Sequence, residues 1–197
     1  GVLLRDPVKA RQLGAAFESD YGGDDGRASV GLDFGYASGD PAPGFGVVQK
    51  PGAKAPKPGD LDGPQANPRS DNRIDNFRFH PDYRIDRILF REIIGTVTDA
   101  TYVRPHARVR LVDESSFRVT ASAAAIASMA NFAESTPGGK KPLGVELDPS
   151  LTYEHKDGFF ATLDYAVLFP LSGLDNPQVG LFAKPAQLVR VRLNYVF

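Results

Sequence analysis

Apolar and polar residues alternate with a period of two along most of the chain. Between residues 27 and 37, for example, Val30, Leu32 and Phe34 are separated by small or charged residues. Successive side chains of a β-strand point to opposite faces, so this pattern places apolar residues on one face and polar residues on the other. The same alternation predicts seven strands, over residues 12–21, 27–37, 102–111, 117–129, 143–154, 159–169 and 188–197.

One segment leaves helix and strand both open. Residues 121–130 are rich in alanine, which favours a helix, but Val119, Thr120 and Ser122 fit a strand equally well. We find no other helical period of 3.6 residues in the chain.

The connections between the expected strands alternate in length. Short polar turns fall at residues 22–26, 113–116 and 155–158, and long connections fall at about 38–97, 131–142 and 170–186. In an up-and-down meander all short turns then lie at one end and all long loops at the other, as in outer-membrane barrels, whereas a Greek-key sandwich has no reason to follow this rule. Strands of about ten residues also match the nine to eleven that cross a bilayer at a tilt.

The fold expected is therefore all-β: an antiparallel up-and-down meander of about seven long strands, part of a transmembrane β-barrel, with one long loop. That loop, residues 38–97, is expected to be an extracellular cap or a constriction. Its first part, residues 38–73, is so rich in proline and glycine that it cannot form a packed element.

The second part of the loop is too apolar to hang free in water. Residues 77–92 interleave aromatic, arginine and aspartate residues, and we expect them to fold inward or to pack on the rim. Carbohydrate stacking on the aromatic rings is an alternative to simple packing. The residues expected to narrow the channel are Phe77, Phe79, Tyr83, Asp86, Arg87 and Arg91.

The polar face of the strands carries many arginines and carboxylates and few lysines. Arginine paired with carboxylates suits a crowded, hydrated wall, because the guanidinium group binds a carboxylate through two parallel hydrogen bonds. The residues expected to line the lumen are Arg104, His106, Arg108, Arg110, Arg118, Glu146, Asp148, Asp164, Arg190 and Arg192.

The arginines of this face have two interpretations. They could attract anionic solutes at a constriction, as charged rings do in pores. Alternatively, carboxylates on neighbouring strands neutralise them, and the candidates are Glu146, Asp148, Glu154 and Asp164.

Aromatic residues on the apolar face gather toward the strand ends. Bands of this kind are typical of the two interfaces of a membrane. Their members are Tyr21, Phe117, Tyr153, Phe159, Phe169, Tyr195 and Phe197.

Composition excludes several classes of protein. With 23 basic and 24 acidic residues the chain lacks the positive charge that drives binding to nucleic acid. No segment approaches the roughly 18 apolar residues of a transmembrane helix. The absence of cysteine excludes disulfides, thiolate metal sites and cysteine nucleophiles.

Candidate chemistry is sparse. His106 could act as a general base, but no spacing connects it to Ser122 or Ser150, and a wall residue is the favoured interpretation. Loop residues with oxygen ligands suitable for calcium do not follow the EF-hand order, so a solvated loop is favoured; they are Asp60, Asp62, Asn67, Asp71, Asn72 and Asp75. We expect no enzyme activity, no metal site and no cofactor.

The C-terminal residues VRVRLNYVF resemble the closing strand of bacterial outer-membrane β-barrels. This resemblance implies that Leu193, Tyr195 and Phe197 are an insertion signal read by the barrel-insertion machinery. Residues 75–95, DNFRFHPDYRIDRILFREIIG, resemble a segment of large porin-like barrels of deltaproteobacterial type. The two resemblances imply a passive channel for small hydrophilic solutes in the outer membrane of a Gram-negative bacterium, in contact with outer-membrane lipid.

Seven strands are fewer than the even number of at least about eight that closes a bacterial barrel. Residues 1–6 also lack the charged and apolar regions of a signal peptide. We therefore expect residues 1–197 to be one barrel segment, the C-terminal part of a longer precursor. Two alternatives remain: a soluble or secreted β-sandwich that binds carbohydrate through its long loops, and an outer-membrane barrel enzyme that acts on lipids.

Overall fold

Eight strands form one antiparallel sheet in the computed structural model, which describes residues 9–23, 26–40 and 73–196. They are β2 (Gly14–Gly22), β3 (Ala28–Ala37), β5 (Ala100–Asp113), β6 (Phe117–Ala130), β7 (Pro142–Leu147), β8 (Ser150–His155), β9 (Phe159–Pro170) and β10 (Ala186–Tyr195). Two very short strands, β1 (Lys9–Ala10) and β4 (Arg73–Ile74), form a separate parallel pair. In this part of the chain no helix combines the length and apolarity that a membrane crossing needs.

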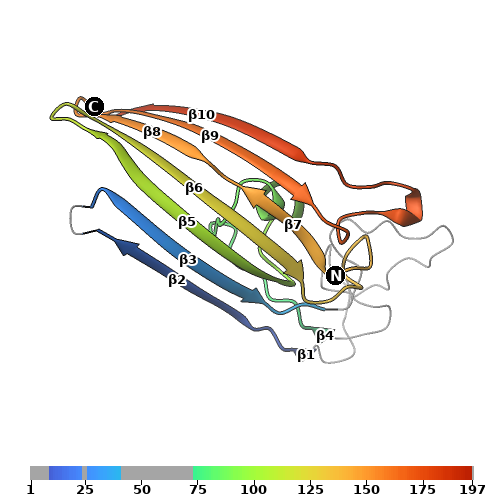
Figure 1. The fold of residues 1–197 in the computed structure, drawn as a ribbon. Coiled ribbons are helices and arrows are strands. Elements are labelled where there is room, and N and C mark those ends of the chain that lie inside the picture. The colour runs from blue at the N-terminus through green and yellow to red at the C-terminus, as the bar shows by residue number, and fades with distance from the viewer. Residues whose placement is uncertain (1–8, 24–25, 41–72, 197) are drawn as a thin grey trace, which may run out of the picture.

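The long strands follow one another in the sheet in chain order. From one edge to the other the order is β2, β3, β5, β6, then β7 and β8 together, β9 and β10. Figure 1 shows the turns β2–β3, β5–β6 and β8–β9 at one end of the sheet and the long connections at the other end. The expected antiparallel meander is confirmed, and residues 121–130 belong to strand β6 rather than to a helix.

The segment predicted as one strand over residues 143–154 is two strands, β7 and β8. The interruption falls at Pro149, which has no backbone N–H to donate. The register is nevertheless the same on both sides of this break, and Ala124 exchanges backbone hydrogen bonds of 3.3 and 2.8 Å with Asp148. The pairing of β6 with β7 shifts only further along, between Ser128 and Met129. The eight strands therefore follow seven paths across the sheet.

The two faces of the sheet have opposite chemistry. We call the face that residues 75–97 cover the inner face, and the opposite one the outer face. Glu146 and Asp164 on the inner face are fully buried, whereas Phe17 and Val191 on the outer face are each 62% exposed. Further exposed residues of the outer face are Val30, Leu32, Phe34, Val109, Leu147, Leu151, Leu163, Phe169, Val189 and Leu193.

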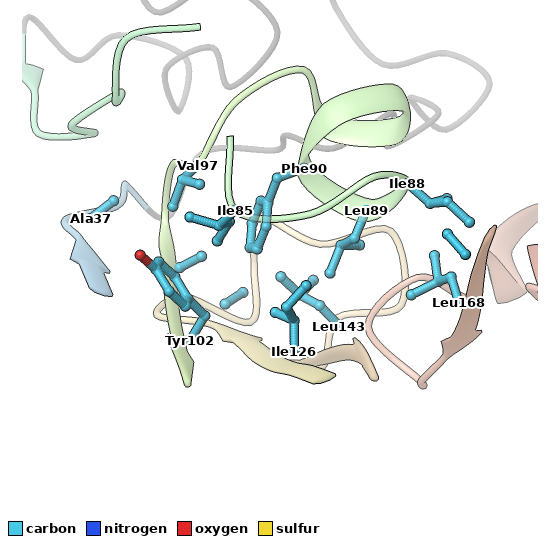
Figure 2. Packing of buried hydrophobic residues seen from close by; sticks show 13 residues of the cluster. Ala37, Ile85, Ile88, Leu89, Phe90, Val97, Tyr102, Ile126, Leu143 and Leu168 are labelled. Carbon is cyan, nitrogen blue, oxygen red and sulfur yellow. The ribbon is translucent and has the colours of Figure 1, made fainter. Parts of the chain in front are cut away.

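Residues 75–97 rest on the inner face at the end that carries the long connections. They include a short π-helix, η2 (Leu89–Ile94); the other described helix is the single 3₁₀ turn η3 (Pro177–Val179). Figure 2 shows apolar side chains of the covering segment meeting those of the sheet. The segment contributes Ile85, Ile88, Leu89, Phe90 and Val97, and the sheet contributes Ala37, Ala100, Tyr102, Ile126, Ala130, Leu143, Ala166 and Leu168.

This cluster is the apolar core of the described protein. Full burial of a Leu, Ile or Phe side chain contributes roughly 1.5–3 kcal/mol. The five apolar residues of the covering segment thus help hold it to the sheet, together with the polar contacts described below.

Strands β2 and β10 are the two edges of the sheet. Within the described residues each pairs with one neighbour, β3 and β9 respectively, and the sheet does not close on itself. The proline-rich residues 41–72 lie outside the described residues, together with the calcium candidates Asp60, Asp62, Asn67, Asp71 and Asn72, and Phe197 of the expected insertion signal.

Candidate functional site

Glu146 anchors the covering segment to the wall formed by the sheet. It lies on β7, and its carboxylate accepts the backbone N–H groups of Arg87 (2.9 Å), Ile88 (2.8 Å) and Leu89 (2.8 Å). These amides precede and begin η2, where a helix leaves N–H groups without partners of its own. Because the carboxylate is fully buried, the three donors replace the water that it loses.

Asp86 stabilises the same turn from inside the segment. Its Oδ2 accepts the backbone N–H of Phe90 at 2.5 Å, and the residue is 6% exposed. Burial raises the pKa of the Asp86 carboxyl to about 7, the Phe90 N–H opposes this shift, and the nearby Glu146 charge adds to it. A proton on Asp86 therefore favours the docked segment.

Arg87 connects the segment to β9 through an ion pair. Its Nη1 lies 2.6 Å from Oδ2 of Asp164, which is buried. The same carboxylate accepts Ser150 Oγ at 2.7 Å and Arg192 Nη2 at 3.1 Å. Asp164 thus joins the covering segment to strands β8 and β10.

Asp33 on β3 has a similar function on the other side of the inner face. Arg104 Nη1 donates to Asp33 Oδ2 at 2.6 Å, and His106 Nε2 lies 3.1 Å from Asp33 Oδ1. His106 Nδ1 faces Asp20 at 3.7 Å. The histidine is therefore positioned between two carboxylates, and Ser150, one of its two candidate nucleophile partners, donates to Asp164 instead.

The aromatic residues of the covering segment contact one another. Phe79 stacks on Tyr83 with ring centroids 4.6 Å apart, and Phe77 meets Phe79 edge to face at 5.1 Å. The hydroxyl of Tyr83 is hydrogen-bonded to that of Tyr102 on β5 at 2.6 Å. These rings pack against the apolar core, so the structure places them in packing contacts rather than as an open stacking platform.

Gly35 makes room for Tyr102. A Cβ atom at Gly35 would lie 2.1 Å from Cε1 and 2.5 Å from Cζ of Tyr102, whose ring crosses from β5 over β3. The absence of a side chain at this position leaves space for the Tyr102 ring, which meets Phe90 at a tilt of 57° with ring centroids 6.4 Å apart.

At the other end of the inner face, near the short turns, the ion pairs lie in water. Arg110 and Arg118 both reach Asp113, at 2.7 and 3.2 Å, and Arg118 lies 3.6 Å from Glu154. Here the arginines are neutralised by a turn carboxylate that the sequence did not single out. Of the expected neutralising residues, Glu154 here and Asp164 above are the two that pair with strand arginines in the described part of the chain.

A hollow of about 710 Å³ lies between residues 84–91 and the wall. Strands β5 and β6 line it with Arg104, residues 106–108 and residues 122–124. Arg108 and Asp148 both line it. Asp148 is 6% exposed, and its nearest ion-pair contact is Arg87 Nε at 4.0 Å.

Several contributing residues were not among the sequence candidates. Asp33 provides the partner for Arg104, and Glu92 lies 3.4 Å from Arg190. Asp99 accepts Ser135 Oγ and the Phe132 N–H, which ties residues 131–135 to the start of β5, and burial raises its pKa to about 7. The alternation of polar and apolar residues places Asp33 on the polar face, but no local sequence pattern identifies Glu92 or Asp99 as a contact residue.

The remaining predicted residues lie on β10. Leu193 and Tyr195 are exposed on the outer face of this edge strand, at 65% and 53%. No group of three or more histidine, aspartate or glutamate residues within the described ranges is arranged to hold a metal ion. Comparisons with protein-family models, with curated proteins and with solved structures find no match to this chain.

Proposed function

We propose that this chain is part of a porin-like β-barrel of the bacterial outer membrane and that it allows passive passage of small hydrophilic solutes. The observation that carries the proposal is the distribution of apolar and charged side chains over the two faces of the sheet. Apolar side chains cover the exposed outer face, while the inner one carries the carboxylates and arginines together with the apolar core under residues 75–97. In water this arrangement leaves a large apolar surface exposed, which soluble monomers rarely do, whereas a bilayer covers it.

Strand geometry supports the same proposal. Strands β5 and β6 have 14 residues each and β9 has 12, which exceeds the nine to eleven residues that a tilted strand needs to cross a bilayer. The short turns at one end and long connections at the other correspond to the periplasmic and extracellular ends of outer-membrane barrels.

An aromatic band at the short-turn end also supports the proposal. Phe117 and Tyr153 stack with centroids 5.7 Å apart, and Tyr153 meets Phe159 at 6.1 Å. Tyr195 is the strand partner of Phe159, and Tyr21 occupies the same end of β2. Aromatic side chains are enriched at the level of the lipid headgroups.

The proposal also accounts for the two edges of the sheet, β2 and β10, each of which pairs with one neighbour among the described residues. An unpaired strand edge in a bilayer leaves N–H and C=O groups without partners, at a cost of several kcal/mol for each group. We therefore include in the proposal that further strands, beyond those of this sequence, pair with β2 and β10 and complete the barrel. The covering segment then narrows the lumen from the extracellular end.

Two measurements test this function. The full-length protein should pellet with membranes, resist extraction by salt or carbonate, and dissolve in detergent. Reconstituted in planar bilayers, it should give discrete conductance steps. A folded protein that is recovered without detergent, or that gives no conductance, contradicts the proposal; recovery without detergent would instead favour a secreted β-sandwich that binds carbohydrate.

A further inference from the structure

The hollow under residues 84–91 is unusually rich in arginine. Its lining also includes three aspartates, Asp20, Asp86 and Asp148. Its volume, about 710 Å³, lies within the range of small-molecule sites. The basic side chains that line it are Arg84, Arg87, Arg91, Arg104, Arg108 and His106.

Two of these arginines are already neutralised. Arg104 is paired with Asp33 and Arg87 with Asp164, both at 2.6 Å. Both of these carboxylates are buried in the wall. Neither arginine therefore adds an uncompensated charge to the hollow.

Three arginines remain. Arg108 is exposed, and its guanidinium group has no hydrogen bond or ion pair with any described residue. Among the described residues, the ion pairs of Arg84 and Arg91 are with acids that are themselves at least half exposed, Asp82 at 3.7 Å and Glu92 at 3.8 Å. Such loose pairs in water neutralise little charge.

The acids of the hollow do not balance these three cations. Asp86 and Asp148 are each 6% exposed, and Asp86 accepts the Phe90 N–H. Burial and the neighbouring cations Arg190 and Arg84 lower the pKa of Arg91, which indicates positive potential at this point. The hollow therefore presents guanidinium groups to the solvent and holds two of its three carboxylates, Asp86 and Asp148, beneath the surface. The third, Asp20, is exposed and lies 3.7 Å from His106 Nδ1.

We propose that Arg84, Arg91 and Arg108 form a binding position for small oxyanions, carboxylates or phosphate, which makes the channel prefer anions to cations. This inference rests on the proposed channel function. A guanidinium group binds two oxygen atoms of such an anion through parallel hydrogen bonds, and an anion relieves the repulsion among the three cations. Charged side chains at a narrow point set the ion preference of a pore.

Reversal potentials across planar bilayers in a KCl gradient test the preference. The wild-type protein should be more permeable to chloride than to potassium, and inorganic phosphate should reduce the chloride current. Arg108→Gln should lower the permeability ratio on the order of twofold, as expected for one unit charge acting through water over several ångströms. The triple variant Arg84→Gln/Arg91→Gln/Arg108→Gln should abolish the preference.

Arg118→Gln is the matched control, because Arg118 lies on the same face but pairs with Asp113 and Glu154. It should shift the ratio less than Arg108→Gln does. A conducting protein that prefers cations, or equal shifts in the two variants, would overturn the inference and leave the channel function intact.

A second readout does not depend on conductance. Calorimetric titration of the detergent-solubilised protein with inorganic phosphate should show binding that Arg108→Gln weakens and Arg118→Gln does not. Absence of phosphate binding to the folded wild-type protein overturns the binding position. Absence of conductance, in contrast, contradicts the proposed function.

Discussion

The two ends of the inner face carry the same types of charged residue and use them differently. At the end covered by residues 75–97, Glu146 and Asp164 are fully buried and hold backbone amides or arginines in fixed positions. At the open, short-turn end, Asp113 and Glu154 lie in water beside Arg118. We call these the covered end and the open end.

The difference between the ends follows from desolvation. Loss of its hydrogen-bond partners lowers the stability of the folded protein far more for a buried carboxylate than for an exposed one, because water cannot replace the lost hydrogen bonds. Exposed ion pairs contribute at most about 1 kcal/mol, since water and salt screen them. Substitutions at the covered end should therefore disturb the structure, whereas equivalent ones at the open end should not.

Glu146→Ala should have the largest effect. It leaves three backbone N–H groups without an acceptor, and at about 1–3 kcal/mol for each unsatisfied group the unfolding free energy should fall by at least about 3 kcal/mol. Hydrogen exchange at Arg87, Ile88 and Leu89 should accelerate strongly. Glu154→Ala is the control on the same strand path, and equal exchange rates in the two variants would show that Glu146 does not anchor the segment.

Gly35→Ala should have the next largest effect. Its Cβ would overlap the Tyr102 ring, and overpacking of this kind typically costs about 1–3 kcal/mol. Gly22→Ala is the control, because a Cβ at Gly22 meets its neighbours at ordinary distances of 3.6 and 3.8 Å. Thermal unfolding in detergent should separate the two variants, and identical melting temperatures would contradict the close approach of Tyr102.

A change of pH should alter the stability less than the two substitutions above do, and it should act on the covered end. The pKa of Asp86 is about 7 in the folded protein and about 4 in an unfolded chain, so between these values the folded state binds more protons. Stability should therefore decrease as the pH rises from 4 to 7. Melting temperatures of Asp86→Asn should fall less steeply over this range, and an unchanged slope would contradict the prediction.

Arg118→Gln should have the smallest effect of the four. Asp113 keeps Arg110 at 2.7 Å, and Glu154 is partly exposed to water. The melting temperature in detergent should not change measurably at moderate salt. A clear decrease would mean that the open end is organised as tightly as the covered end.

Much of the sheet could be predicted from alternation alone. The strands lie close to the expected ranges, and Asp33, Arg104, Glu146 and Asp164 share a face as the pattern indicated. This success has a simple cause, because the side-chain period of two is a local property of the backbone. The break between β7 and β8 could also have been expected from Pro149, because proline cannot donate a backbone hydrogen bond to the sheet. The alternation of apolar and polar residues does not include this effect.

Which strands pair, and which side chains then contact one another, could not be predicted in the same way. Strands β3 and β5 are separated by residues 38–99, so no short turn sets the register that places Asp33 opposite Arg104. The turn η2 forms where Leu89 and Phe90 meet the sheet and Glu146 accepts its first amides. Its conformation depends on contacts distant in sequence, which no local pattern encodes.

The anchor at Glu146 also has a consequence for the order of assembly. The carboxylate lies 57 to 59 residues after the amides that it accepts, so three further strands must be made before it exists. Contacts between such distant residues form slowly because a long loop must close first. The backbone amides of residues 87–89 therefore gain this acceptor only when β7 joins the sheet, although their apolar neighbours can meet β5 and β6 earlier.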